Sequence, residues 1–158
     1  MQDSTFLRMA ITNLDAIADY FIYIANETGS FISNLKLQKL VYYAQAWHLG
    51  IYDTPLFEED FEAWVHGPVI PSLFYKYKEF GWKPILKEVE QPKFMSELEE
   101  FLENLTEEYF ICDGYELELM VTREDPWKLA RKGLARDEPS HAIITKESMR
   151  IFYKERAA

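Results

Sequence analysis

The stretch from Leu35 to Trp82 constrains the fold of this chain most, because it combines a helical stripe with a dense set of aromatic side chains. Twelve of the chain's twenty-five aromatic residues fall within residues 41–82. Apolar residues in its first part recur at three- and four-residue spacing, which is typical of a helix that buries one face. The stripe consists of Leu37, Leu40, Val41, Ala44 and Trp47, while Lys36, Lys39 and Gln45 are expected to face elsewhere.

The same periodicity predicts helices along most of the chain, with capping residues at their ends. Thr12 or Asn13 is expected to cap the first helix and Gly29 to end it. Ser33 or Asn34 is expected to cap the second, with Gly50 near its end. Helices are predicted at 14–25, from 34 to about 50, at 73–80, 98–109 and 115–121, from Asp125 with its carboxylate as N-cap to Gly133, and after Thr145.

A short strand or hairpin arm is predicted between the second and third helices. Phe61, Ala63 and Val65 alternate with more polar or amphipathic residues, which is the strand period, and His66-Gly67-Pro68 is expected to break the chain after them. The fold class is therefore mainly α with a small β hairpin or short strands. We expect a single compact helical domain over 1–158, with a lead-in at 1–12 and a C-terminal tail at 154–158.

Length and composition point to one domain in a reducing compartment. A chain of 158 residues can bury one core, and none of its apolar runs approaches the ~18–20 residues that span a bilayer. Charged side chains interrupt the first twenty residues, so no signal peptide is expected. Cys112 is the single cysteine and cannot form an intramolecular disulfide. These features predict a soluble, cytoplasmic protein with no membrane partner.

The net charge of −10 is concentrated in one segment. Residues 86–125 hold thirteen carboxylates and only three basic side chains, and the rest of the chain is balanced. Duplex DNA or RNA would be repelled there, because nucleic-acid affinity depends on cations that neutralise phosphates. A basic protein partner is compatible with this charge, and a solvated helix face that keeps the protein soluble is the alternative.

The sequence contains no recognisable catalytic set. The acidic turn around Cys112 should raise the pKa of its thiol, and the three histidines lack metal-ligand spacing. Phosphate-binding glycine motifs are also absent from the sequence. We therefore expect no enzyme activity, no cofactor and no metal. A hydrolase that uses His66 with Glu62 is an alternative, but no nucleophile accompanies the pair.

Aromatic side chains are expected to form a recognition surface. The consecutive pairs Tyr42-Tyr43 and Phe74-Tyr75 cannot all face inward from one helix, so some must be exposed. Exposed Tyr and Trp are favoured interface anchors. For His48 and His66 a structural role is open as well, as a hydrogen bond at a helix interface and to the Gly-Pro turn respectively. The predicted partner-binding residues are Tyr42, Tyr43, Trp47, His48, His66, Phe74 and Tyr75.

Four motifs in register resemble the Panacea domain, whose members are also described as GepA-like phage-associated or SocA-like proteins. They are LKLQKLVYYAQAWHLG, Tyr52-x-x-Pro55-Leu56-Phe57, Glu62-Ala63-Trp64 with Gly67-Pro68-Val69, and Glu124-Asp125-Pro126-Trp127-x-x-Ala130-Arg131. The resemblance implies that the motif residues serve as framework, and we expect the tryptophans in general to be framework as well. The framework residues are Leu37, Lys39, Leu40, Tyr43, Ala44, Trp47, Pro55, Leu56, Trp64, Gly67, Pro68, Val69, Glu124, Pro126, Trp127, Ala130 and Arg131.

The resemblance also implies a function. Such domains are antitoxins of bacterial or prophage toxin-antitoxin pairs that neutralise a protein toxin, encoded by a neighbouring gene, through direct binding. The alternative is a proteolysis adaptor that delivers the toxin to an ATP-dependent protease, which would then be a second partner. No feature of the sequence predicts an oligomeric state.

Three features bear on how far this resemblance extends. Thr122 stands where the family usually has a histidine, so a role tied to that histidine is in doubt. Some relatives carry an N-terminal DNA-binding domain, whereas about a dozen residues precede the first expected helix here, so operator binding is not expected. The Ala157-Ala158 terminus is similar to tags read by bacterial unfoldases, although chance also explains two alanines.

Overall fold

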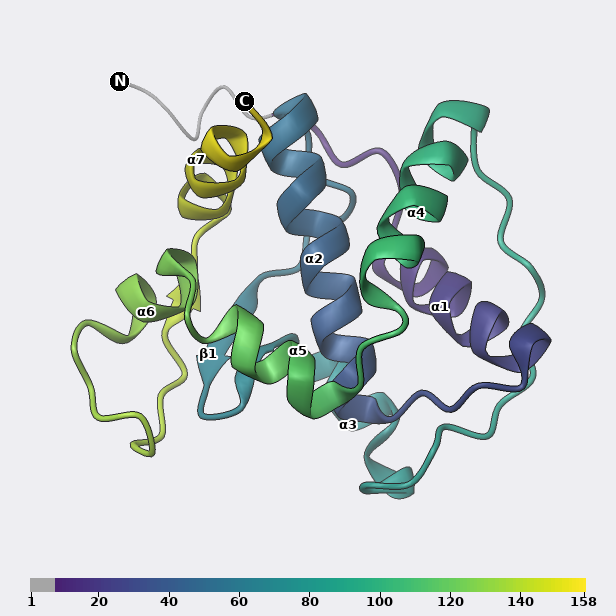
Figure 1. Cartoon of the computed structure of the whole chain (residues 1–158), viewed down its shortest axis with the longest axis horizontal. Coiled ribbons are helices and arrows are strands. Elements are labelled where there is room, and N and C mark those ends of the chain that lie inside the picture. Colours follow the sequence, from purple (N-terminus) through teal and green to yellow (C-terminus); the bar gives the residue numbers. More distant parts are fainter. Residues whose placement is uncertain (1–7) are drawn as a thin grey trace.

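The computed structural model describes residues 8–158, and within them the fold is mainly helical with one small antiparallel sheet (Figure 1). The predicted fold class is confirmed, and residues 1–7 of the predicted lead-in lie outside the described part. In chain order the elements are α1 (Leu14–Thr28), α2 (Asn34–Tyr52), β1 (Phe61–Trp64), β2 (Gly67–Val69), α3 (Pro71–Lys76), the 3-10 helix η2 (Lys78–Phe80), α4 (Ser96–Tyr109), α5 (Gly114–Val121), α6 (Asp125–Arg131), β3 (Ile143–Ile144) and α7 (Lys146–Ala157).

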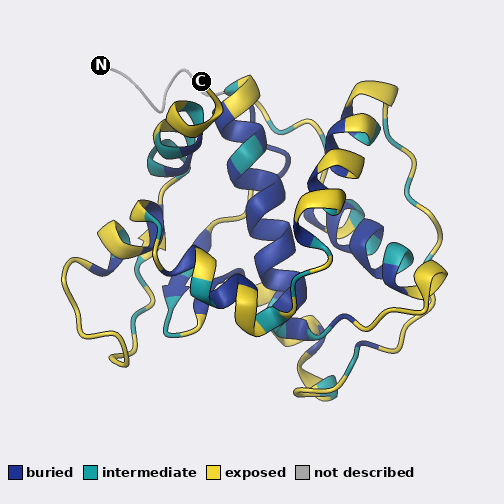
Figure 2. Cartoon of the chain, viewed as in Figure 1, coloured by how far each residue is buried: buried dark blue, intermediate teal, exposed yellow. Residues whose placement is uncertain are grey.

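Helix α2 is the centre of the molecule and is buried on nearly all sides (Figure 2). It packs most extensively against α7, and α1, α4, α5 and the hairpin contact its other faces. The predicted single buried stripe is therefore too narrow, since Lys36, Lys39 and Gln45 are buried as well. Tyr42 and Tyr43 are both fully buried, so of the two aromatic pairs expected to include exposed rings only Phe74-Tyr75 does, through Tyr75.

The ends of the helices follow the predicted capping chemistry in most places. Asn13 Oδ1 accepts a hydrogen bond from the backbone N–H of Ala16, Ser33 caps α2 and Thr145 caps α7. Gly29 ends α1 with a φ of 67°. These predictions are confirmed.

Two predicted helix ends differ from the structure. Helix α6 begins at Asp125 with Glu124 at the N-cap position, and the Glu124 carboxylate is directed into the core instead of capping the helix. Helix α7 continues through Ala157, so the predicted tail at 154–158 is almost entirely helical. Among residues 8–158, no helix combines the length and apolarity needed to cross a bilayer.

Gly50 allows α2 and α7 to approach closely. A Cβ atom at this position would lie 2.6 Å from the carbonyl carbon of Tyr153. The helix continues past Gly50 to Tyr52, and Asp53 is its C-cap with a φ of 55°. Gly50 therefore permits a helix crossing and does not end the helix.

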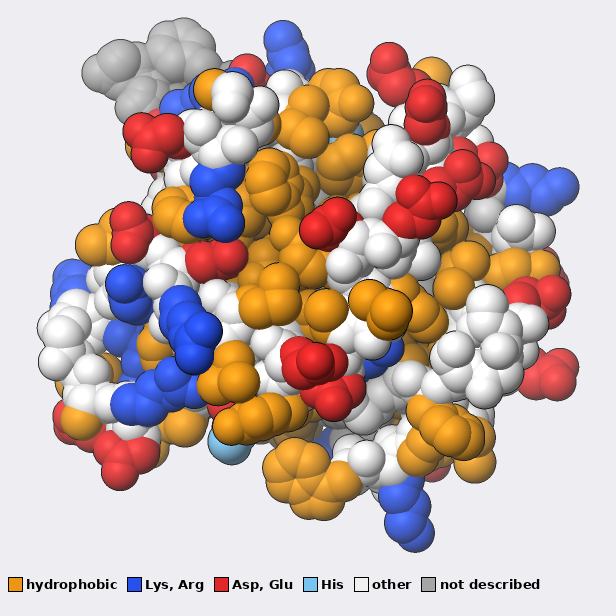
Figure 3. All heavy atoms as spheres, viewed as in Figure 1, with side chains coloured by type: hydrophobic (Ala, Val, Ile, Leu, Met, Phe, Trp, Pro, Cys, Tyr) orange, Lys and Arg blue, Asp and Glu red, His pale blue; other side chains and the backbone are white. Residues whose placement is uncertain are grey.

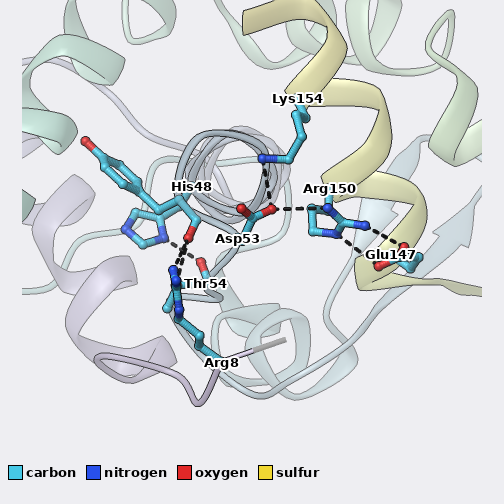
Figure 4. A network of polar contacts seen from close by, with 8 residues as sticks. Arg8, His48, Asp53, Thr54, Glu147, Arg150 and Lys154 are labelled. Carbon is cyan, nitrogen blue, oxygen red and sulfur yellow. Dashed lines mark hydrogen bonds and ion pairs between the residues drawn. The ribbon is translucent and has the colours of Figure 1, made fainter. Parts of the chain in front are cut away.

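Polar contacts fix the C-terminal end of α2 to α7 (Figure 4). Asp53 Oδ1 lies 2.9 Å from Lys154 Nζ and 3.1 Å from Arg150 Nη1, and Arg150 also pairs with Glu147 at 2.7 Å. Hydrogen bonding from Lys154 and Arg150 lowers the pKa of the Asp53 carboxyl below its ordinary value. Since these pairs are partly exposed, they orient α7 more than they stabilise it.

Strands β1 and β2 form the predicted hairpin, and β3 pairs with the other edge of β1 to give the order β2-β1-β3. The predicted break at His66-Gly67-Pro68 is correct only for His66: the turn falls at Val65 and His66, whereas Gly67 and Pro68 belong to β2, where they pair with Trp64 and Ala63. Pro68 is tolerated because β2 is an edge strand. The two-residue strand β3 was not predicted from the sequence, since it is too short to show an alternating pattern.

Candidate functional site

The structure separates the seven predicted partner-binding residues into three regions. Tyr42 and Tyr43 lie in the core. Trp47 and His48 lie on the side of α2 that faces α4, with His48 buried and Trp47 partly buried. The other three, His66, Phe74 and Tyr75, surround the hairpin on another side of the molecule.

Tyr42 and Tyr43 are core residues in this structure. The Tyr43 ring stacks on Tyr109 with ring centres 4.2 Å apart, and its hydroxyl donates to Glu124 Oε1 at 3.3 Å. Tyr153 donates to the same oxygen. Burial raises the pKa of the Glu124 carboxyl above its ordinary value. The contacts of Tyr43 support a framework role. Tyr42 and Tyr43 are both fully buried, so neither ring offers a contact surface to a partner.

His48 also supports the fold. Its Nδ1 lies 2.5 Å from the Thr54 carbonyl oxygen, and the Arg8 guanidinium donates to the carbonyl of Tyr52 beside it (Figure 4). Burial lowers the pKa of the His48 imidazole. The structural alternative for His48, a hydrogen bond at a helix interface, matches this arrangement.

His66 and Phe74 line a cavity that we call the hairpin groove, and Tyr75 packs against Phe74 beside it. It has a volume of about 530 Å³, which is within the usual range for ligand sites. The start of α2, the hairpin, α3 with η2, and the segment before β3 form its walls. Its lining residues are Asn34, Leu35, Gln38, Trp64, Val65, His66, Val69, Phe74, Lys78, Gly81, Trp82, Pro139, Ser140 and His141.

Two buried amides from α2 are part of the hairpin groove. Asn34 Nδ2 donates to the carbonyl of Phe74 at 3.0 Å, and Gln38 Oε1 accepts from the N–H of Ile70 at 2.9 Å. The other atom of each amide, Asn34 Oδ1 and Gln38 Nε2, is buried without a partner among the described residues. Sequence reasoning missed both residues, although two amide side chains one turn apart beside an apolar stripe were a usable signal.

Aromatic side chains form much of the wall of the hairpin groove. Trp64 packs edge-on against Phe74, with ring centres 5.3 Å apart, and lies 5.8 Å from the ring of His141. Trp82 is 83% exposed, so the expectation that all tryptophans are framework is wrong for this residue. Tyr75, next to Phe74, is 60% exposed and extends the aromatic surface outward.

The histidines at the hairpin groove pair with carboxylates in an arrangement that was not predicted. His66 Nδ1 lies 3.1 Å from Glu118, which also pairs with Arg136 at 3.5 Å. His141 Nδ1 lies 3.0 Å from Glu62. The expected contact of His66 with the Gly-Pro turn is therefore wrong, and so is the pairing of His66 with Glu62 on which the hydrolase alternative depended.

Arg131 holds the segment that leads into the wall of the hairpin groove. Its guanidinium donates to the carbonyls of Ala63, Ala135, Arg136 and Glu138, and it lies over the Trp127 ring at 4.7 Å. Trp127 in turn donates its indole N–H to the carbonyl of Trp64. These contacts support a framework role for both motif residues.

Lys39 is a buried cation beneath the hairpin. It is fully buried, and its Nζ lies 3.5 Å from the carbonyl oxygen of Pro68. Burial lowers the pKa of the Lys39 ammonium to about 7, although the nearby Glu118 carboxylate opposes this shift. A Cβ on Gly67 would lie 2.8 Å from Lys39 Cε, and the φ of 114° at Gly67 also favours glycine. The buried side chain of Lys39 therefore limits the size of the residue at position 67, so these two motif residues constrain each other.

Replacing Lys39 with methionine is expected to stabilise the fold by about 1–2 kcal/mol at pH 6, because a buried charge is replaced by an apolar chain of similar size. The unfolded chain binds a proton on Lys39 more tightly than the folded one, so the destabilisation is full below pH 7. It fades as the pH rises toward the ordinary lysine value of 10.5. Urea unfolding at pH 6 and pH 9 should show the advantage of the variant shrinking.

The exposed Lys83 provides the control for this prediction. Lys83→Met should leave the free energy of unfolding within about 0.5 kcal/mol of the parent at both pH values. Equal stability of the Lys39→Met variant and the parent at pH 6 would show that the folded protein tolerates the Lys39 charge.

A second groove lies between α2 and α4 and has an acidic rim. Its volume is about 840 Å³, and its lining includes Trp47, Glu97, Glu100, Glu108 and Tyr109. The indole N–H of Trp47 donates to the Tyr109 hydroxyl at 2.8 Å. Acidic side chains along α4 stand out in Figure 3, which fits the predicted exposed acidic face of this helix.

Basic side chains gather over α6 and the segment that follows it (Figure 3). Lys128, Lys132 and Arg136 are exposed there. The sequence did not predict this patch, because acidic residues elsewhere in the chain offset these basic residues in the charge count. The surface therefore presents both signs of charge on separate elements.

Two observations concern the reactivity of Cys112 and the possibility of metal binding. Burial and the neighbouring Glu116 raise the pKa of the Cys112 thiol, as expected from the acidic turn. Within residues 8–158, no group of three or more His, Cys, Asp or Glu side chains is arranged to hold a metal ion.

Comparison with known proteins identifies the family. The family described as "Antitoxin SocA-like, Panacea domain" matches residues 37–128, which is more than half of the chain. This chain belongs to that family. The matched part of the Panacea domain runs from α2 to the start of α6 and includes the hairpin and α3. The resemblance of the sequence motifs is confirmed.

One curated relative of this Panacea domain is Antitoxin SocA from Caulobacter vibrioides (strain NA1000 / CB15N). It is 39% identical over 83 residues, which cover 52% of this chain and 44% of the relative. The match therefore spans less than half the length of that relative. No solved structure matches this chain.

Thr122 stands where the resemblance of the sequence led us to expect a histidine. Its side chain is buried, and its hydroxyl donates to the carbonyl of Glu118 at 2.7 Å. A threonine hydroxyl can close such a bond within its own helix. The Thr122 hydroxyl therefore makes its hydrogen bond at the C-terminal end of α5. The same helix carries Glu118, the carboxylate partner of His66.

Proposed function

We propose that this Panacea domain is an antitoxin that neutralises a cognate protein toxin by direct binding. The family match supports an antitoxin role, and it covers the hairpin and α3, where exposed aromatic side chains border an open groove. That groove is the observation that carries the proposal of direct binding. Of the predicted partner-binding residues, we retain His66, Phe74 and Tyr75 as contacts and add Trp82.

The exposed aromatic rings favour a protein partner. Trp82 and Tyr75 offer large rigid contact areas, and rigid aromatic anchors lose little side-chain entropy on binding. Lys78 lies over the Tyr75 ring at 5.4 Å, so a cation is present at the rim of the hairpin groove. The acidic side chains of α4 would speed association with a toxin that carries basic patches.

Co-expression with the product of a neighbouring gene tests this function. Wild-type protein should restore growth that the toxin alone arrests, and the two proteins should co-purify. The double variant Tyr75→Ala, Trp82→Ala should reduce the affinity at least about tenfold, since each truncated anchor is expected to cost more than 1 kcal/mol. Ile111→Ala, at a site that is also exposed but distant in sequence from the hairpin groove, is the matched control.

A harmless neighbouring product, or a toxin that stays active and unbound beside the wild-type protein, would contradict the proposal. The half-life of the toxin separates occlusion from the adaptor alternative. Simple occlusion leaves the half-life unchanged or lengthens it, whereas an adaptor shortens it in cells that contain the protease. We propose occlusion, because the hairpin groove offers a binding surface and no second surface is needed for it.

A further inference from the structure

The hairpin groove contains an unused pair of hydrogen-bonding atoms that points to its ligand. Asn34 is 3% exposed and Gln38 is fully buried, yet Asn34 Oδ1 and Gln38 Nε2 find no partner within the described chain. A buried polar atom without a partner costs about 1–3 kcal/mol. The two lining residues therefore hold one acceptor and one donor without a partner, and because both atoms are themselves buried, a ligand has to displace the surrounding side chains to pair with them.

The assignment of the two atoms follows from their neighbours. The Asn34 nitrogen is identified because it donates to the Phe74 carbonyl, and the Gln38 oxygen is identified because it accepts from the Ile70 N–H. The free atoms are thus an oxygen on Asn34 and an N–H on Gln38. Since the residues are four positions apart on α2, their Cβ atoms lie about 5–6 Å apart on one face of the helix.

This pattern matches the backbone of an extended peptide. In a strand, the N–H and the C=O of one residue project toward the same side, and a partner can bond to both. One extended residue could therefore donate to Asn34 Oδ1 and accept from Gln38 Nε2. Its side chain, or that of its neighbour, would pack on the apolar wall formed by Val69, Phe74 and Trp82.

We propose that the hairpin groove binds an extended, uncharged peptide segment of the toxin, with one backbone residue paired to Asn34 and Gln38 and an apolar side chain packed against the aromatic wall. This inference rests on the proposed antitoxin function and specifies the chemistry that the groove recognises.

The charges of the hairpin groove disfavour an ionic ligand. His66 and His141 are already paired with Glu118 and Glu62, which leaves Lys78 as the cation in the lining. Lys78 is exposed and its Nζ lies over the Tyr75 ring, so a phosphate or carboxylate held against the buried amides would lose its hydration without a counter-ion beside it. The two amides therefore select a neutral group.

The shape of the hairpin groove favours a chain over a small heterocycle. Small-molecule sites usually bury most of the ligand surface. Here one wall is Trp82, which is 83% exposed and leaves the groove open to solvent. A peptide can continue out of such an opening in both directions.

The probe for this proposal is N-acetyl-phenylalanine N-methylamide, which places one apolar side chain between two peptide groups. In ¹⁵N-labelled protein, the side-chain NH₂ signals of Gln38 and Asn34 report on the two amides directly. We expect saturable shifts of the Gln38 signals, with a dissociation constant on the order of 1 mM for so small a probe. The analogue methylated on both amide nitrogens should produce shifts at least about tenfold weaker.

Two variants locate the binding. Gln38→Met removes the free donor but also the acceptor for the Ile70 N–H, so its fold must be checked by the dispersion of its spectrum. Trp82→Ala changes only an exposed wall, and it keeps the proposal testable if Gln38→Met fails to fold. Both should weaken probe binding at least about fivefold, while the exposed Leu86→Ala, outside the lining, should not.

Three outcomes would overturn the inference. The first is equal binding of the probe and its methylated analogue, the second is full binding by the Trp82→Ala variant, and the third is tighter binding of uracil, which would indicate a heterocycle site. In each case wild-type protein could still protect cells from the toxin, so the proposed function would stand. Failure of the wild-type protein to protect would remove the proposed function instead.

Discussion

Replacing Glu124 with alanine is expected to lower the free energy of unfolding by about 3 kcal/mol or more. The Glu124 carboxylate accepts hydrogen bonds from the hydroxyls of Tyr43 and Tyr153, both of which are buried. Alanine leaves both hydroxyls without this acceptor in a part of the core where α2, α6 and α7 meet. Urea unfolding followed by tryptophan fluorescence measures the loss.

The Glu124→Gln variant provides the control, because its carbonyl oxygen can still accept from the tyrosines. It should lose less than about half as much stability as the alanine variant. Since burial raises the pKa of Glu124, the folded state binds this proton more tightly than the unfolded state. The wild-type protein therefore gains stability relative to Glu124→Gln as the pH falls toward 4, and loses that gain as the pH rises through the folded pKa.

A loss below 1 kcal/mol in Glu124→Ala would show that water or a rearranged side chain replaces the carboxylate. It would also weaken the framework interpretation of the motif, which rests on Glu124 facing inward. That orientation has a simple origin. Asp125 and Pro126 occupy the first turn of α6, which leaves the preceding residue free to turn its side chain toward the core.

The helices were predictable because their signals are local. Leu98, Phe101, Leu102, Leu105 and Tyr109 repeat at helical spacing, and all five are buried on one side of α4. The cap of α5 is equally local, since the Asp113 side chain and Glu116 form a reciprocal capping box. Such patterns require no knowledge of the rest of the fold.

The burial of α2 on all sides was not predictable in the same way. A stripe shows that one face is buried, and Lys36, Lys39 and Gln45 were expected to face away from it, but the spacing does not show that their side is buried too. These side chains are accommodated by carbonyl groups from distant segments: Lys36 donates to Phe110, and Gln45 to Phe57. The partners of a buried polar side chain depend on tertiary structure, so sequence spacing cannot reveal them.

Only part of the candidate site was predictable, because some of its features also depend on tertiary structure. His66, Phe74 and Tyr75 lie at or beside the hairpin groove, as expected for exposed residues near a turn. Trp82 was expected to be framework along with the other tryptophans, and here it follows Gly81 on an exposed turn. Asn34 and Gln38 carry no motif, and their free atoms become visible only when the other half of each amide is seen to be occupied.

Replacing Arg131 with methionine is expected to have the largest effect, a loss of about 3–5 kcal/mol in the free energy of unfolding. The side chain is buried and its guanidinium donates to four backbone carbonyls, one in β1 and three in the segment after α6. Methionine has a similar length and can fill the space, but it donates no hydrogen bond. The carbonyl of Ala63 would be left buried, and differential scanning calorimetry should show the fall in stability.

The Arg131→Lys variant separates the charge from the geometry of the guanidinium. Lysine keeps the cation but cannot reach both β1 and the 135–138 segment in one plane, so we expect it to recover less than half of the loss. Because the 135–138 segment leads into Pro139 and His141 of the hairpin groove, both variants should also weaken toxin binding at temperatures where the protein is still folded. Wild-type affinity in a folded Arg131→Met protein would show that the wall of the groove forms without this side chain.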